Sequence, residues 1–210
     1  MSETLLCGID EAGRGPLAGP VCAASVILPE HFPKHLLADS KKLKAATREE
    51  LKTVIFGTAT AWGLGWVSAS EIDQMNIHNA SLLAMERAFT AMMDRIGQMG
   101  QIGQVGEMDQ MNEMNQGSNR ANIHVIVDGK FSPRLPVPCQ PLVKADTQIP
   151  EVMAASILAK TSRDRLMEYY SVFYPRYGYE RHKGYPTKAH RQAIALYGTS
   201  PIQRLTYSWR

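Results

Sequence analysis

Residues 5–28 read LLCGIDEAGRGPLAGPVCAASVIL, and this stretch decides the fold class. It contains two short apolar runs, 5–9 and 21–28, separated by a segment rich in glycine and proline. Because glycine and proline interrupt strands and form turns, the pattern predicts two neighbouring strands joined as a hairpin. The first run ends in an acidic pair, Asp10 and Glu11.

The rest of the chain alternates between helix-like and strand-like segments. Thr47-Arg-Glu-Glu50 has the form of a capping box, which predicts a helix from there to Gly57. The elements expected after it are a strand over 58–68, a helix from Ser70 that breaks near Asn76 and resumes through Met93, an apolar strand over 123–127 buried on both faces, a proline-interrupted strand over 137–143, and a long helix from Pro150 to about Tyr170. This order predicts an α/β protein, with a mixed sheet and helices on its faces.

One segment does not fit this pattern. Residues 97–119 read GQMGQIGQVGEMDQMNEMNQGSN, a composition of glycine, glutamine, methionine and asparagine with no proline. We interpret it as a low-complexity insertion, disordered or weakly helical, between a helix and the strand that ends at Asp128. It should therefore lie at the end of that strand opposite to Asp128.

The composition limits the class of protein. The 210 residues are 44% hydrophobic and 20% charged, enough for one domain (1–210) with a buried core. No run of about 18 uncharged apolar residues is present, so we expect no membrane span. The N-terminus lacks the pattern of a secretory signal, and three cysteines are too few for a disulfide framework or a zinc cluster. We therefore expect a cytoplasmic protein with reduced thiols.

The net charge of +3 is unevenly distributed along the chain. Residues 160–210 contain 10 Lys and Arg against 3 Asp and Glu, whereas the preceding part of the chain is acidic overall. A basic C-terminal quarter suggests a polyanionic partner, although a solvated helical face explains the same surplus.

Four carboxylates stand where apolar runs stop: Asp10, Glu11, Asp128 and Asp146. Carboxylates gathered at one edge of a sheet repel one another, so a cation that neutralises them is expected. Oxygen ligands suit Mg²⁺ or Mn²⁺. Asp10 and Glu11 could reach one metal only if the backbone bends there, which the flanking Gly8 would permit. Each acid also has an ordinary interpretation, as a turn residue, a helix cap or a solvated strand end.

The segment 13–19 is rich in glycine but is not a phosphate-binding loop of known type. It has neither a Gly-Lys-Ser/Thr sequence nor the G-x-G-x-x-G spacing. It is either a tight hairpin turn or a stretch of backbone that a sugar-phosphate can approach closely, with Arg14 beside it.

Taken together, these motifs resemble those of bacterial ribonuclease HII, a type 2 ribonuclease H. The resemblance covers about 1–96 and 121–205, and it rests on Gly8-Ile-Asp-Glu-Ala-Gly-Arg-Gly-Pro-Leu-Ala-Gly-Pro20, Asp39-Ser-Lys-Lys-Leu43, Val127-Asp-Gly129, Lys144-Ala-Asp146, Ala154-Ala-Ser-Ile-Leu-Ala-Lys160 and His182-Lys-Gly-Tyr-Pro-Thr187. Two features depart from the family: the 97–119 insertion, and Ala145 where a glycine usually precedes the fourth acid. The C-terminus shows no clamp-binding peptide, so we expect no clamp partner and a monomer.

The resemblance implies a ribonuclease H-like fold, a five-stranded mixed sheet flanked by helices with a small C-terminal helical part over about 171–210. It implies an endonuclease that cleaves RNA in RNA/DNA hybrids and incises at ribonucleotides embedded in duplex DNA, leaving 3′-hydroxyl and 5′-phosphate ends. The four acids would be the catalytic metal ligands. For substrate binding the resemblance implies Gly13, Arg14, Gly15 and Tyr185. Five basic residues are plausible phosphate contacts: Lys41, Lys42, Lys160, Arg163 and Lys183.

This chemistry suits the residues. Two metal ions about 4 Å apart can activate the attacking water and stabilise the leaving oxygen, so no Ser, Cys or His nucleophile is needed. Selectivity for RNA requires a contact to the 2′-hydroxyl. The resemblance implies that the main chain and arginine of the Gly-Arg-Gly segment contact the junction sugar and phosphates, and that Tyr185 stacks on the deoxyribose after the ribonucleotide. Two other classes remain open: a resolvase or transposase, which would share the acids, and a non-catalytic nucleic-acid-binding module.

Overall fold

The computed structural model describes residues 4–37, 45–102 and 123–208. Its centre is a five-stranded mixed sheet in the order β3-β2-β1-β4-β5. β1 (Leu5–Ala12) pairs antiparallel with β2 (Val21–Ile27), which pairs antiparallel with β3 (Ala61–Val67). β4 (Ile123–Asp128) runs parallel to β1, and β5 (Cys139–Leu142) runs parallel to β4. The mixed sheet expected from the sequence is confirmed.

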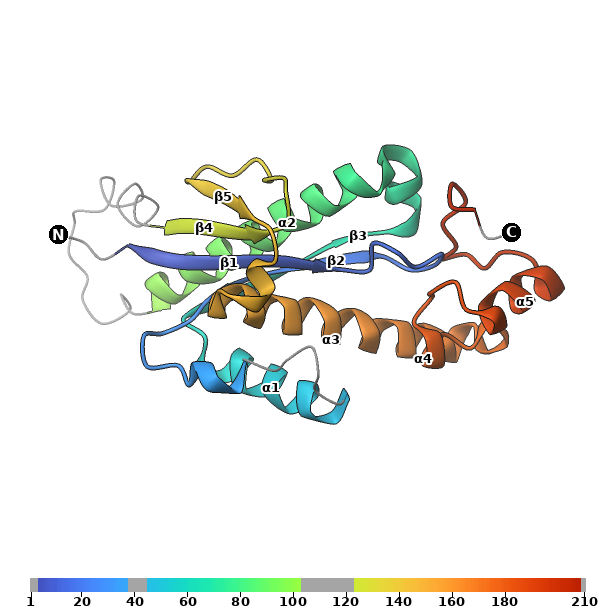
Figure 1. Cartoon of the computed structure of the whole chain (residues 1–210), viewed down its shortest axis with the longest axis horizontal. Helices are drawn as coiled ribbons and strands as arrows, with labels where there is room; N and C mark the ends of the chain where they lie inside the picture. Colours follow the sequence, from blue (N-terminus) through green and yellow to red (C-terminus); the bar gives the residue numbers. More distant parts are fainter. Residues whose placement is uncertain (1–3, 38–44, 103–122, 209–210) are drawn as a thin grey trace.

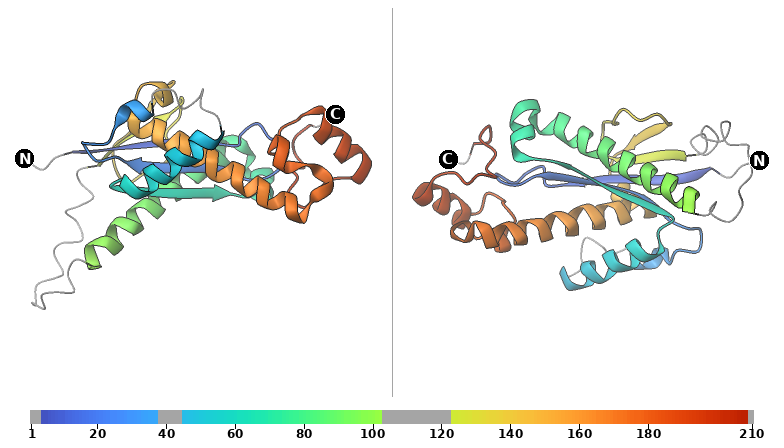
Figure 2. Two further views of the ribbon diagram at one scale, coloured as in Figure 1. Left: turned by 90° about the horizontal axis from the view of Figure 1, so that it is seen from below. Right: turned by 180° about the vertical axis from the view of Figure 1, so that it is seen from behind.

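Helices cover both faces of the sheet, as Figures 1 and 2 show. α2 (Ala69–Ile102) lies on one face, and α1 (Ala45–Thr58) and α3 (Pro150–Phe173) lie on the other. Two short helices, α4 (Tyr179–His182) and α5 (Lys188–Tyr197), follow at the far end of α3 and form the expected C-terminal helical part. Short 3₁₀ turns occur at η1 (Lys34–Leu36), η2 (Ala145–Thr147) and η3 (Pro175–Tyr177).

Two apolar layers hold the helices to the sheet. Ile9 and Val125 contribute to the layer under α2, together with Phe89 from that helix. Val26 and Leu158 contribute to the layer under α1 and α3. Since alternate residues of a strand face opposite sides, a strand in the middle of this sheet has to be apolar on both faces, and every residue of β2 is buried.

Two helix starts differ from the sequence prediction. α1 already begins at Ala45, so Thr47 lies inside the helix and does not cap it. A capping box forms at the start of the other helix, α2, where a helix was expected from Ser70 and begins at Ala69. There the Ser68 amide donates to the Glu71 carboxylate at 2.8 Å, and the Glu71 amide donates to the Ser68 hydroxyl at 3.3 Å. The break predicted near Asn76 is present, because this residue has φ 70° and ψ 163°.

Three other expectations need correction. β4 contains His124, and its residues alternate between buried and half-buried, so it is not buried on both faces. β5 is limited to Cys139–Leu142, shorter than the 137–143 run. α2 continues past Met93 to Ile102, so the first residues of the 97–119 segment extend this helix. The remainder of that segment lies outside the described residues.

Two further sequence expectations concern the membrane and the thiols. In the ranges that the structure describes, no helix is long and apolar enough to cross a membrane. Cys7, Cys22 and Cys139 are free thiols, and the first two are buried.

Candidate active site

Three of the predicted acids meet at one edge of the sheet. Asp10 lies near the carboxyl end of β1, Asp128 is the last residue of β4, and Asp146 lies in η2, shortly after β5. β1 and β4 are parallel neighbours, so their carboxyl ends lie at the same edge. One carboxylate oxygen from each of the three residues lies within 4.8 Å of the others.

Local packing fixes the positions of these acids. At Gly8, a methyl group would lie 2.2 Å from both the Glu151 carbonyl carbon and the Val152 nitrogen, so only glycine lets the start of α3 approach β1 this closely. Ahead of η2, Lys144 has a left-handed backbone (φ 61°) that turns the chain toward the sheet edge. The Asp146 amide faces Asp128 Oδ1 at 3.5 Å.

The electrostatics of the cluster are unfavourable without a cation. Asp10 is 6% exposed. Burial, followed by the negative charges of Glu11 and Asp128, raises the pKa of Asp10 well above its usual range, against hydrogen bonds from Ser156 and the Glu11 amide. Burial also raises the pKa of Glu11, although Arg14 opposes this effect. Keeping the Asp10 and Glu11 carboxylates ionised therefore costs free energy.

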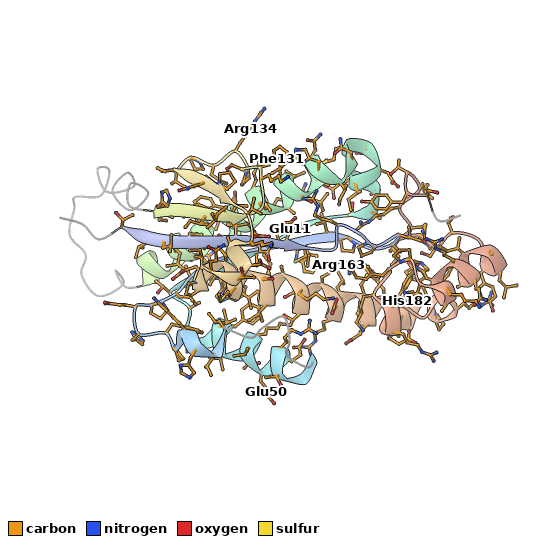
Figure 3. All side chains as sticks on the ribbon, in the orientation of Figure 1. Glu11, Glu50, Phe131, Arg134, Arg163 and His182 are labelled. Atoms are coloured by element: carbon orange, nitrogen blue, oxygen red, sulfur yellow. The ribbon has the colours of Figure 1, made fainter. Side chains whose placement is uncertain are left out.

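Glu11 lies next to Asp10 on β1. The group of three mutually close carboxylates does not include it, but its negative charge acts on Asp10. Its Oε1 accepts a bond from Arg14 at 3.1 Å. Its Oε2 is buried, and no residue in the described part of the chain donates a hydrogen bond to it. Figure 3 labels Glu11 on β1, in the middle of the molecule.

The residues fit a divalent cation. Three mutually close carboxylates, a raised Asp10 pKa and a buried Glu11 oxygen to which no described residue donates are features of a site that a cation can occupy. The donor set consists of oxygen atoms, which suits Mg²⁺ or Mn²⁺. Free Cys7 and Cys22 are buried with raised pKa values, so neither offers a thiolate.

A cleft of about 430 Å³ opens beside the acids. Its lining includes several of the predicted substrate-binding residues together with Arg48 and Ser156, which the sequence analysis did not select. The full lining is Glu11, Ala12, Gly13, Arg14, Gly15, Arg48, Ser156, Ile157, Lys160 and Tyr185. Ser156 lies inside the Ala154–Lys160 motif, which was the only sequence signal for it. Nothing in the sequence distinguished Arg48 from an exposed helical residue.

The predicted basic residues differ in their environments. Lys160 pairs with Asp164 at 2.6 Å and lies 5.8 Å from the centre of the Tyr185 ring. Lys183 pairs with Glu168 at 2.8 Å. Arg163 was expected at a phosphate, but it is 1% exposed and its guanidinium faces main-chain carbonyls inside the protein. Lys41 and Lys42 lie outside the described residues.

The five-stranded mixed sheet carries an acid cluster at its strand ends, and the cleft beside the cluster carries arginine and lysine. These features define a nuclease with the ribonuclease H-like fold. The family model for ribonuclease HII matches residues 7–210. Ribonuclease HII of Treponema denticola is 48% identical over 206 residues, covering 97% of this chain and 98% of that protein. That of Dechloromonas aromatica is 42% identical over 203 residues, covering 97% and 90%. The chain belongs to the ribonuclease HII family, and it is therefore a nuclease hydrolase of RNA/DNA hybrids.

Solved structures agree on the fold. Ribonuclease H2 from Pyrococcus horikoshii superposes with a TM-score of 0.67 at 24% identity, covering 98% of this chain and 94% of that one. Ribonuclease HII in a complex with PCNA from Archaeoglobus fulgidus gives 0.70 at 23% identity, covering 98% and 96%. A Bst ribonuclease HIII in complex with Mn²⁺ gives 0.66 at 16% identity, covering 99% and 68%.

Proposed function

We propose that this enzyme, besides cleaving RNA in RNA/DNA hybrids, incises duplex DNA at single embedded ribonucleotides and leaves 3′-hydroxyl and 5′-phosphate ends. The observation that carries the proposal is the position of the three-acid cluster beside a cleft lined by both the Gly13–Gly15 segment and Tyr185. One wall of this cleft offers main chain and the other an aromatic ring. A single sugar can therefore be held next to the acids.

Asp10, Asp128 and Asp146 would hold Mg²⁺ or Mn²⁺, with the unsatisfied Glu11 oxygen as a further donor. When bound, two such ions supply a nucleophilic water and charge stabilisation at the leaving oxygen. Asp10 and Asp146 are buried and Asp128 is half-buried, so these carboxylates are held in place to bind the ions. Burial raises the pKa of Asp10, so a divalent ion bound by this carboxylate would compete with a proton.

The remaining cleft residues bind and orient the nucleic acid. Gly13 has φ 99°, a left-handed conformation that turns the backbone of this segment toward the cleft. Such main-chain groups suit the 2′-hydroxyl, the one group that separates a ribonucleotide from its neighbours in DNA. Tyr185 is 39% exposed, so its ring face is free to stack on the adjoining sugar. Lys160, at 34% side-chain exposure, is placed for a phosphate contact that carries no sequence information.

We also propose a single catalytic domain over 1–210 that works as a cytoplasmic monomer without a clamp partner. The free thiols support a reducing compartment. The Archaeoglobus fulgidus relative was solved in a complex with PCNA, which makes the clamp proposal worth testing by co-elution with the bacterial sliding clamp.

A gel assay tests the proposed activity. A labelled DNA duplex with one embedded ribonucleotide, an all-DNA duplex and an RNA/DNA hybrid are incubated with enzyme and either Mg²⁺ or chelator. We expect metal-dependent cleavage of the first and third substrates only, with 3′-hydroxyl ends that a polymerase can extend. Cleavage of the all-DNA duplex would favour a resolvase-like enzyme, and binding without turnover would favour a non-catalytic module.

A further inference from the structure

Two arginines are buried between the glycine-rich segment and the C-terminal part of the chain. Arg163, on α3, is 1% exposed, and Arg204, from the segment after α5, is fully buried. Figure 3 shows Arg163 between α3 and the extended β1–β2 connection. Arginine is almost never fully buried unless it is paired, so both positions require an explanation.

Every nitrogen of the Arg163 guanidinium donates to a main-chain carbonyl. Nε donates to Pro20 at 2.9 Å, and Nη2 donates to Ala18 at 3.2 Å, both in the connection between β1 and β2. Nη1 donates to Lys183 at 3.1 Å, in the segment that leads into Tyr185. One side chain therefore bonds the two chain segments that continue from the cleft lining, the one after Gly15 and the one before Tyr185.

Arg204 holds the same connection from its other side. Its guanidinium donates to Gly13 at 2.6 Å, Arg14 at 3.0 Å and Gly19 at 2.9 Å. The Tyr207 hydroxyl also donates to the Arg14 carbonyl, at 3.0 Å, and lies 3.4 Å from Arg204 Nη1. The Gly13 and Arg14 carbonyls are therefore held by bonds to buried groups of the C-terminal segment.

The space around these bonds is closed. A methyl group at Gly13 would lie 2.1 Å from Arg163 Nε, and one at Gly184 would lie 2.4 Å from the Ala18 carbonyl oxygen. The Leu17 amide donates to the Gly184 carbonyl at 2.8 Å. The Gly13–Pro20 connection and the chain next to Tyr185 therefore form one tightly bonded unit with the two guanidinium groups.

Stability alone does not account for this arrangement. In the described part of the chain neither guanidinium forms an ion pair, so two like charges are buried against carbonyl dipoles. Burial and the nearby Arg204 charge lower the pKa of Arg163 to about 10, which leaves it protonated at neutral pH. Apolar side chains of similar volume often give equal or greater stability than buried charges.

We infer that Arg163 and Arg204 are positioning residues that fix the Gly13–Gly15 wall relative to the Tyr185 wall, and so set the selectivity for a single ribonucleotide. The inference rests on the proposed function of these two walls. Neither arginine touches the substrate. Each acts through the main chain that it orients, and a displacement of about 1 Å there is enough to lower a rate about 100-fold.

The test compares Arg163→Lys with Arg165→Lys, an exposed residue on the same helix. Lysine keeps the charge but has one nitrogen, so it cannot bond three divergent carbonyls. For Arg163→Lys we expect single-turnover cleavage at a lone ribonucleotide to fall at least about 10-fold, with duplex affinity in chelator within about three-fold of wild type. Arg165→Lys should match wild type in both assays, and thermal unfolding reports whether each variant is folded.

Each outcome is decisive. If wild-type enzyme does not cut the lone-ribonucleotide duplex, the proposed function fails. If it does and Arg163→Lys cuts equally fast, or loses affinity and rate in parallel, the positioning role is overturned. If Arg163→Lys does not fold, Tyr207→Phe decides, since it removes only a hydroxyl, which donates to the Arg14 carbonyl and accepts from Arg204 Nη1. A several-fold slower rate at unchanged affinity supports the inference, and an unchanged rate overturns it.

Discussion

Gly8→Ala tests how the packing of α3 against β1 sets the acid cluster. The added methyl group would lie 2.2 Å from two backbone atoms of α3, at Glu151 and Val152, whereas ordinary contact begins near 3.4 Å. The start of α3 must therefore retreat by roughly 1.2 Å. Backbone cannot rotate away as a side chain can, so we expect a loss of at least about 1–3 kcal/mol in unfolding free energy.

The displacement also reaches the site. α3 carries Ser156, which bonds Asp10, and η2 with Asp146 directly precedes the helix. A shift of about 1 Å should lower cleavage of an RNA/DNA hybrid by about 100-fold. Gly57→Ala is the matched control, because a methyl group in that α1 position meets nothing within 4 Å. It should leave cleavage unchanged and raise stability by about 0.5–1 kcal/mol. Thermal unfolding and initial cleavage rates measure both variants, and a Gly8→Ala enzyme as stable and active as wild type would refute this account of the packing.

Three other predictions follow from individual side chains. Asp10→Asn should lower cleavage by orders of magnitude, and its unfolding temperature in chelator should equal or exceed that of wild type because charge repulsion in the cluster is relieved. The control Asp94→Asn, on α2, should leave both cleavage and unfolding temperature unchanged. Near wild-type turnover by Asp10→Asn would exclude this acid from the metal site. Tyr185→Ala should depress cleavage at a lone ribonucleotide much more than duplex binding, and equal losses would make Tyr185 a general binding residue. Glu71→Gln should lower the free energy of unfolding by about 1 kcal/mol at pH 7, because Arg87 and Ser68 lower the pKa of Glu71 from 4.5 to about 2. This stabilisation is complete above about pH 4.5 and is lost as the pH falls toward 2. The unfolding temperatures of wild type and variant should therefore converge near pH 2.

The sequence predicted the sheet better than the helix ends. Apolar runs bounded by glycine and proline located the β1–β2 hairpin, since strand burial depends on local pattern. Where a helix starts depends on which polar side chain accepts a hydrogen bond from a backbone amide of the first turn, and the sequence pattern alone does not show this. Thr47 and Ser68 carry equivalent signals, and only Ser68 is at a helix start. The extension of α2 past Gly97 was also missed, because a glycine without a positive φ weakens a helix and does not end it.

For the candidate site, the position of each acid after an apolar run and the family resemblance led us to expect that the acids gather, whereas the strand order that brings them together comes from the structure. Asp10 and Asp128 end parallel neighbouring strands, so the pattern and the topology together bring them close. The sequence could not separate Glu11 from Asp10, because the two acids are adjacent and only the structure shows which carboxylate lies close to both Asp128 and Asp146. Nor could it show that Arg163 is buried, since a basic residue on a helix is usually exposed and two of its three carbonyl partners lie 143 and 145 residues away along the chain.

The central claim is that the acid cluster at the sheet edge holds the divalent ions that drive cleavage. Its most direct test is an anomalous difference map from crystals of the enzyme grown with Mn²⁺, compared with crystals of Asp10→Asn. The account predicts Mn²⁺ peaks bounded by the carboxylates of Asp10, Asp128 and Asp146 in the wild-type enzyme, reduced or absent in the variant. Mn²⁺ bound only elsewhere, in an enzyme that still cleaves RNA/DNA hybrids, would contradict it.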